Sequence, residues 1–173
     1  FMDGAKHWNG RGQGFQPPLG HYLVSLKRAQ AIAQLPDAMA PWPELKIGNN
    51  DDDRAKGLRF RGYKLVEGRR PVFSYTAGNT VIEDYVIPQG GPLPSFTRQL
   101  TLTGSGKYYY LAGADGLIQK RGDSWKIGKN LKVTLDTPDK PILRDGAGGK
   151  ELLVPVEVKG KAIIRAKYEW DLN

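Results

Sequence analysis

The feature that most constrains the fold is a stretch of regular alternation between Gly57 and Thr103. Large apolar or aromatic side chains take every second position in successive short runs, and glycine-containing segments separate these runs. A period of two is the pattern of a β-strand with one buried face, and short glycine turns join neighbouring antiparallel strands. The stretch therefore predicts an antiparallel meander.

The rest of the chain favours more of the same architecture. A length of 173 residues suits one domain, and 22 glycines with 12 prolines are typical of a sheet protein that has many turns. We predict an all-β fold, a single antiparallel β-sandwich that is either complete by itself or part of a larger supersandwich. The sandwich is expected over residues 21–173, after an irregular Gly/Pro-rich arm over residues 1–20.

Within the meander, Gly62 interrupts the alternation and predicts a β-bulge that re-phases its strand. The change of phase is expected to bury Tyr63 and Leu65. Two further glycine segments, 104–106 and 159–161, predict turns between strands.

Two later strands carry informative patterns. Arg98 shares a face with apolar neighbours, so it either lies at the sheet border with its stem along the core or pairs with a buried carboxylate. The run Tyr108 to Tyr110 puts aromatic rings on both faces, which suits a strand buried on both sides or one face that meets a partner or a sugar. The last strand has an apolar stripe that predicts a core face, made of Ile164, Ala166, Tyr168 and Trp170.

The segment before the meander is harder to assign. Residues 21–35 predict a hairpin, with a short helix as the alternative for the Ala-rich part. Pro36, Pro41 and Pro43 then break regular structure, because proline lacks the N–H that a ladder needs. Trp42 is expected to pack over a sheet edge.

The net charge of +8 and a pI near 9.6 would suit an anionic partner. However, the lysines and arginines are scattered along the chain, and many fall at expected turns or on outward strand positions. This distribution favours a solvated surface, and it gives little support for specific nucleic-acid binding.

Residue chemistry gives little sign of catalysis. The absence of cysteine excludes disulfides, thiolate metal sites and haem attachment through C-x-x-C-H within this sequence. No G-x-S-x-G, Walker loop, H-E-x-x-H or dinucleotide-binding fingerprint occurs, and His7 and His21 have no obvious third ligand. No run approaches the ~20 apolar residues of a membrane-spanning helix. The start at Phe1, with no signal-peptide pattern after it, predicts a removed leader or a piece of a longer polypeptide.

The meander nevertheless resembles a known family. The residues that carry the likeness are Phe60, Gly62, Tyr63, Gly68, Pro71, Phe73, Tyr75, Val81, Arg98, Leu100 and Leu102. They are similar to a β-rich domain of large exported bacterial proteins that combine c-type cytochrome modules with a propeller like that of glucose/sorbosone dehydrogenases. The segments 35–43 and 151–170 look similar as well, so the likeness extends from about residue 21 to the C-terminus.

The resemblance implies a periplasmic or extracellular β-sandwich that packs beside a redox partner. Neither haem-attachment cysteines nor a propeller occur in this sequence, so any haem is expected on partner domains or chains. The leading hypothesis is a non-catalytic accessory subunit, or a fragment, of an exported cytochrome-type assembly, which contacts other protein chains.

Two other classes of function stay open. A carbohydrate-binding sandwich would use exposed rings as a stacking platform, and an enzyme on the same scaffold would need Arg98, Tyr63 and His21 to converge in a cleft. The candidate partner or ligand contacts are His7, Trp8, Trp42, Tyr108, Tyr110 and Trp125.

Overall fold

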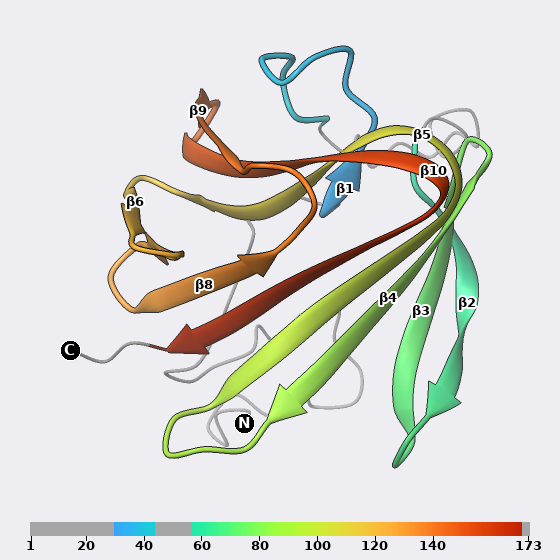
Figure 1. Ribbon diagram of the computed structural model, residues 1–173, viewed down its shortest axis with the longest axis horizontal. Helices are drawn as coiled ribbons and strands as arrows, with labels where there is room; N and C mark the ends of the chain where they lie inside the picture. The colour runs from blue at the N-terminus through green and yellow to red at the C-terminus, as the bar shows by residue number, and fades with distance from the viewer. Residues whose placement is uncertain (1–29, 44–56, 171–173) are drawn as a thin grey trace, which may run out of the picture.

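The computed structural model describes residues 30–43 and 57–170, and it is all-β and antiparallel, as the alternation predicts (Figure 1). The strands are β1 (Ile32–Ala33), β2 (Arg59–Val66), β3 (Arg70–Ala77), β4 (Thr80–Gln89), β5 (Ser95–Asp115), β6 (Ile118–Arg121), β7 (Ser124–Ile127), β8 (Leu131–Asp136), β9 (Ile142–Gly146) and β10 (Gly149–Trp170). The described residues contain no helix that could cross a membrane. The expected arm over residues 1–20 and most of the hairpin over residues 21–35 lie outside the described residues.

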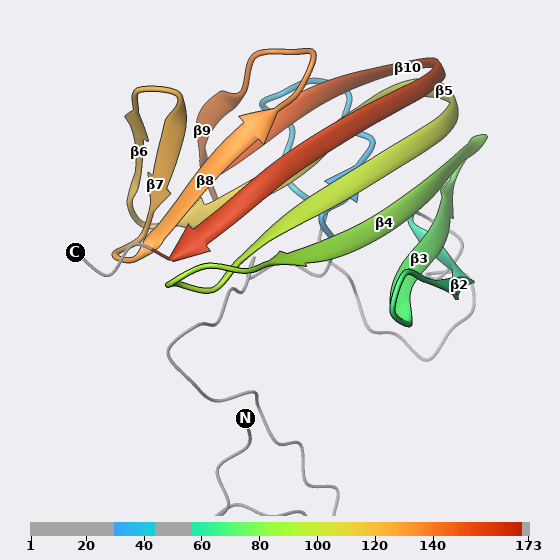
Figure 2. The same ribbon diagram turned by 60° about the horizontal axis from the view of Figure 1, so that its bottom comes forward.

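Two long strands form the spine of the sheet. β5 and β10 have 21 and 22 residues and pair along nearly their whole length, from Asp115 with Lys150 to Ser95 with Glu169. Both strands bend near their middle, so one half of each strand lies in one layer and the other half lies in a second layer (Figure 2).

The two layers differ in width. The wide layer follows the order β2-β3-β4-β5-β10-β8-β7-β6 and uses the first half of β5 and the second half of β10. The narrow layer consists of β1, the second half of β5, the first half of β10 and β9. Among the described residues, the narrow layer therefore covers only part of the wide one.

The bend corrects two sequence predictions. Segments 104–106 and 159–161 were expected to be turns, but β5 and β10 continue through them, and Gly104 pairs directly with Gly160. Both glycines have positive φ, +140° and +84°, which lets the strands change direction without ending the ladder. A Cβ on Gly104 would collide with the backbone oxygen of Asn79. A Gly-x-Gly sequence therefore bends this strand rather than reversing it.

The main core lies between the layers. Leu100, Leu102 and Ile164 of the wide layer belong to the same buried cluster as Tyr108 and Val156 of the narrow layer. The predicted C-terminal stripe is confirmed, since all four of its members are buried: Ile164, Ala166, Tyr168 and Trp170.

A second cluster covers the outer face of the narrow layer. Trp42 packs there with Leu111 of β5 and Leu153 of β10, and Tyr109 lies against the same cluster. The strand with three successive tyrosines is thus buried on both sides, which was one of its two predicted readings. Trp42 covers a face of the layer, whereas the sequence predicted an edge.

A buried ion pair anchors the segment that carries Trp42. Arg144 Nη2 donates to Glu151 Oε2 at 2.7 Å, and both side chains are almost fully buried. Arg144 Nη1 also donates to the carbonyl oxygens of Ala38, at 2.7 Å, and Ala40, at 2.5 Å. One guanidinium thereby joins β9 and β10 to the proline-rich segment.

Candidate interaction surface

The β2–β3 hairpin forms one end of the wide layer, and we call it the wing (Figures 1 and 2). The bulge predicted at Gly62 is confirmed, because the register of β2 against β3 shifts between Phe60 and Gly62. The prediction that Tyr63 and Leu65 are buried is wrong, since they are 64% and 54% exposed, and Phe60 is 56% exposed. The wing therefore presents large apolar side chains to solvent.

These side chains belong to the face of the sheet that forms the core elsewhere. Pairing places Tyr63 beside Phe73, Phe73 beside Asp84, Asp84 beside Leu100, and Leu100 beside Ile164. Directly paired residues of neighbouring strands have side chains on the same face of a sheet. Along this row the exposed fraction falls from 64% at Tyr63 to 2% at Leu100 and 1% at Ile164. Tyr63 thus continues the core face beyond the part that the narrow layer covers.

The aromatic rings of the wing contact one another. The ring centroids of Phe60 and Tyr75 lie 5.5 Å apart, those of Tyr63 and Phe73 lie 6.2 Å apart, and those of Phe60 and Phe73 lie 6.5 Å apart. All three pairs are tilted, with interplanar angles of 48–57°. Tilted pairs at these distances attract each other beyond simple burial. The rings therefore form one contiguous aromatic cluster that faces solvent.

The other face of the wing is basic. Arg59 pairs with Thr76 and Lys64 pairs with Val72, positions that alternate with the aromatic ones. Residues 59–70 contain five arginines and lysines but one acidic residue, Glu67. Lys64 forms an ion pair with Glu83 of the neighbouring strand β4, at 2.6 Å. The wing thus combines an apolar face with a basic face.

The edge of the sheet is also open there. β2 is the terminal strand of the sheet path, and within the described ranges 30–43 and 57–170 it pairs with β3 alone. An edge strand presents a row of unpaired N–H and C=O groups to solvent. The wing therefore offers backbone groups as well as side chains to another chain.

Next to the wing, Arg98 forms a buried ion pair. Its Nε and Nη2 donate to the two carboxylate oxygens of Asp84 at 2.9 and 2.5 Å. Burial by itself lowers the pKa of Arg98, but the hydrogen bonds to Asp84 and the charge of that carboxylate outweigh it, so the pKa lies above its usual value. Of the two predicted roles for Arg98, pairing with a buried carboxylate is confirmed. The pair borders a cavity of about 120 Å³ that Tyr75 and Leu58 also line.

Two buried phenols lie close to this ion pair. The Arg98 guanidinium is 5.9 Å from the ring centroid of Tyr110, whose hydroxyl lies 2.6 Å from that of Tyr168. Tyr168 donates in turn to the carbonyl oxygen of Ala112 at 2.9 Å. Burial raises the pKa of Tyr110 and raises that of Tyr168 well above its usual value. These hydroxyls keep their protons and hold the two layers together.

Of the four predicted contact residues that the structure describes, three lie away from the surface. Trp42, Tyr108 and Tyr110 are buried, and their rings do not form an exposed stacking platform. Tyr108 donates to the carbonyl oxygen of Ala77 at 2.8 Å, and Trp42 Nε1 donates to that of Gln30 at 3.1 Å. His7 and Trp8 lie outside the described residues.

Trp125 is the predicted contact that reaches the surface. It is half-buried on β7 and lines an open hollow of about 510 Å³ together with Leu135, Pro138 and Pro141. The polar residues around this hollow are Lys120, Asp123, Thr137, Asp139 and Lys140. The hollow lies toward the opposite end of the wide layer from the wing.

Two of the three candidates for a catalytic site, Tyr63 and Arg98, do not come together. Tyr63 lies on β2, and two strands separate it from Arg98 on β5, whose guanidinium is held by Asp84. His21 lies outside the described residues. Within the described part of the chain, no three His, Cys, Asp or Glu side chains are grouped to hold a metal ion.

The exposed aromatic residues of β2 are what sequence reasoning missed. Phe60 and Tyr63 alternate with Arg59 and Lys64, a pattern that fits a strand with one buried face. The available signal was the density of arginine and lysine over residues 59–70, which is typical of an edge strand. Alternation identifies the two faces but does not tell whether another layer covers the apolar one.

Comparison with known proteins gives no match: no family model, no curated protein and no solved structure is significantly similar to this chain. The likeness to cytochrome-associated domains therefore stays a prediction from the sequence.

Proposed function

We propose that this chain is a non-catalytic subunit or fragment of an exported, cytochrome-type redox assembly, in which it makes contacts with other protein chains. The observation that carries the proposal is the exposed aromatic surface of the wing, made of Phe60, Tyr63 and Leu65. The family resemblance supplies the cytochrome context and the periplasmic or extracellular location. Haem, in this proposal, belongs to the partner chains.

The wing has the composition of a protein contact. Aromatic side chains are enriched at protein interfaces, where they contribute more binding energy than most other residues. A cluster of large exposed apolar residues, bordered by charge, commonly marks such a site. Because Phe60 and Tyr63 already contact Phe73, a partner would not have to order them when it binds.

The buried charges support a structural role for the rest of the chain. Arg98 is held by Asp84, and Arg144 is held by Glu151 and two backbone oxygens. These guanidinium groups stabilise the layers and the proline-rich segment. Their hydrogen-bond donors are directed at protein groups, which suits packing better than chemistry on a substrate.

The test is native mass spectrometry of material purified from its natural source, with an absorption spectrum of the same sample. We expect a species larger than 19.2 kDa that contains this chain and shows the Soret band of haem. A larger complex without a Soret band would keep the interaction role and remove the cytochrome context. A colourless 19.2 kDa monomer would contradict both.

A second candidate function has one specific observation in its favour. The hollow beside Trp125 combines an indole ring with Asp123 and Asp139, and aromatic faces with nearby polar groups suit binding of a sugar. A glycan array tests this, with Asp139→Asn and Trp125→Phe as variants that should weaken any hit. Asp145→Asn, a change of the same kind outside the hollow, is the control. An array without hits would remove this candidate.

A further inference from the structure

We propose that the wing receives an acidic, extended segment of its partner, which pairs with the free edge of β2 as an added strand. The inference rests on the proposed function and specifies the chemistry of the partner. Such a segment would alternate carboxylates with apolar residues. Its backbone would bond to β2, its apolar side chains would cover the aromatic face, and its carboxylates would meet the basic face.

The outer edge of β2 can accept another strand. β2 runs from Arg59 to Val66, and the five residues from Gly62 to Val66, after its bulge, are enough for a short ladder with an incoming strand. The described residues leave its outer side without a partner strand. Strand addition satisfies the backbone groups there, and main-chain hydrogen bonds give such complexes much of their affinity.

The two faces of the wing carry side chains of different chemistry. Phe60, Tyr63 and Leu65 lie on one face of the wing, while Arg59 and Lys64 lie on the other. Successive side chains of an added strand also point to opposite faces of the sheet. A segment with alternating apolar and acidic residues would therefore match both faces of the wing at once. A ligand bound to one face alone would contact only the aromatic or only the basic side chains.

The charge of the wing selects against a second copy of this chain. Residues 59–70 carry five arginines and lysines but one acidic residue, so two β2 edges brought together would set like charges opposite each other. Like charges across a strand pair are destabilising, and basic edge strands commonly prevent self-association. The same charges attract a carboxylate-rich strand.

The geometry also favours a protein strand over a nucleic acid. A single-stranded nucleic acid needs aromatic rings for its bases and cations for its phosphates along one groove. On the wing, Phe60 and Tyr63 face away from Arg59 and Lys64, and their rings are tilted against Phe73. Bases stacked on the aromatic face would leave the phosphates without the cations of the basic face.

The first experiment measures peptide binding to the full chain by fluorescence anisotropy. The probe is a ten-residue labelled peptide in which glutamate alternates with valine and phenylalanine. We expect saturable binding that weakens as NaCl is raised, because exposed charges are screened by salt. A peptide with lysine in place of glutamate and a scrambled peptide of the same composition should bind at least roughly tenfold more weakly. Equal binding of all three would overturn the proposal.

Backbone pairing is tested by N-methylation. Successive N–H groups of a strand point to opposite edges, so methyl groups on the odd or the even positions block different edges. We expect one methylated peptide to lose binding and the other to retain it. If both bind as well as the unmodified peptide, the contact does not involve strand addition.

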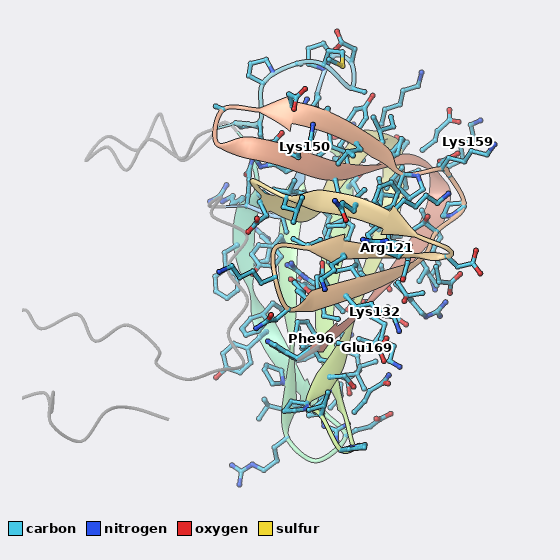
Figure 3. All side chains as sticks on the ribbon, turned by 90° about the vertical axis from the view of Figure 1, so that its left-hand side faces the viewer. Phe96, Arg121, Lys132, Lys150, Lys159 and Glu169 are labelled. Carbon is cyan, nitrogen blue, oxygen red and sulfur yellow. The ribbon has the colours of Figure 1, made fainter. Side chains whose placement is uncertain are left out.

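Variants of the chain locate the site. Phe60→Ser with Tyr63→Ser, and separately Arg59→Glu with Arg61→Glu, should each weaken binding by roughly tenfold or more. The matched control is Lys120→Glu with Arg121→Glu on β6, the strand at the other end of the sheet path, where Figure 3 shows Arg121. Because all of these residues are exposed, the variants should fold, which circular dichroism checks. A control variant that loses binding equally would place the contact elsewhere.

Two further outcomes would contradict the assigned occupant. A labelled oligothymidylate that binds more tightly than the peptide, with the same variants weakening it, would indicate nucleic acid. A photo-crosslinker at position 63 that reacts with this chain itself, instead of the peptide, would indicate that the chain covers its own wing.

The inference and the proposed function can fail separately. If the native chain is found in a complex that the wing variants leave intact, the interaction role stands and the edge is not its site. If the peptide binds but the native material is monomeric, the edge chemistry stands and the assembly proposal falls.

Discussion

Tyr63 of the wing and Ile164 of the spine lie in one cross-strand row of the same sheet, yet the first is 64% exposed and the second 1%. Each is followed by a basic residue, Lys64 or Arg165, and both have side chains on the same face of the sheet. The difference comes from what lies above them. The narrow layer packs on the halves of β5 and β10 that belong to the wide layer. The described residues leave the aromatic face of β2 open.

The comparison shows that burial on a sheet is a property of the neighbouring layer. An apolar stripe is needed for a core, but the same stripe becomes a contact surface where the opposing layer is narrower. In this protein the wing and the spine can be altered separately. The following predictions test how far the two regions differ, starting from the largest expected effect.

Replacing Arg144 by methionine should cost about 3–5 kcal/mol of unfolding free energy, because the buried carboxylate of Glu151 would lose the guanidinium bonded to it. Guanidinium unfolding measures this cost. The control is Lys150→Met, which removes an ion pair to Asp145, a residue with an 87% exposed side chain, and should cost under about 1 kcal/mol. Similar losses for both variants would contradict the role assigned to the buried pair.

A change of leucine to alanine should lower the free energy of unfolding far more in the spine than in the wing. Leu102→Ala opens a cavity in the main core and should cost about 2–5 kcal/mol, while Leu65→Ala on β2 should cost about 0.5 kcal/mol or less. Both values come from chemical unfolding under one set of conditions. A large loss for Leu65→Ala would show that the wing is covered in solution.

The bend of the spine should be sensitive to a single methyl group. Gly104→Ala places a Cβ against the backbone of Asn79 and Thr80 at φ of +140°, and we expect a loss of about 1–3 kcal/mol. Gly116→Ala is the matched change, since a Cβ there meets nothing within 4 Å and should alter stability little. Thermal unfolding compares the midpoints of the two variants, and we expect a lower midpoint for Gly104→Ala. Equal midpoints would contradict a bend that requires glycine at position 104.

The buried phenols should make stability fall in alkali. Burial raises the pKa of the Tyr168 hydroxyl in the folded chain well above 10.0, its usual value. Between pH 10 and that raised pKa, the unfolded chain has therefore lost a proton that the folded chain retains. Stability from this group is therefore complete below pH 10 and falls above it, by at most about 1.4 kcal/mol per pH unit. Tyr168→Phe removes this dependence, so the stability difference between the two proteins should shrink from pH 9 to pH 11. If the unfolding free energies of the two proteins fell in parallel between pH 9 and pH 11, the raised pKa of Tyr168 would be contradicted.

Local pattern was enough to predict much of the fold. The alternation around Leu100 and Leu102, the bulge at Gly62 and the stripe ending at Trp170 all follow from the period of a strand. Arg98 among apolar neighbours allowed either a position at the sheet border or a pair with a buried carboxylate, and nothing in the sequence singled out Asp84 as its partner.

What could not be predicted depends on contacts between distant segments. A glycine such as Gly104 suits a turn and a bend equally, and only its pairing with Gly160 distinguishes them. The exposure of Tyr63 depends on the width of the opposing layer, and the burial of Tyr108 and Tyr110 depends on which strands cover both faces of β5. These are tertiary properties, so the aromatic residues chosen as contacts from the sequence were mostly core residues, and those of the wing were missed.

The long pairing of β5 with β10 also has a kinetic consequence. Its ladder joins residues far apart in the sequence, up to Ser95 with Glu169, and no tight turn connects the two strands. Closing such loops costs chain entropy before the contacts repay it, and proteins dominated by distant pairings fold slowly. The spine should therefore set the pace of refolding, while the wing, a hairpin of consecutive strands, can form in microseconds.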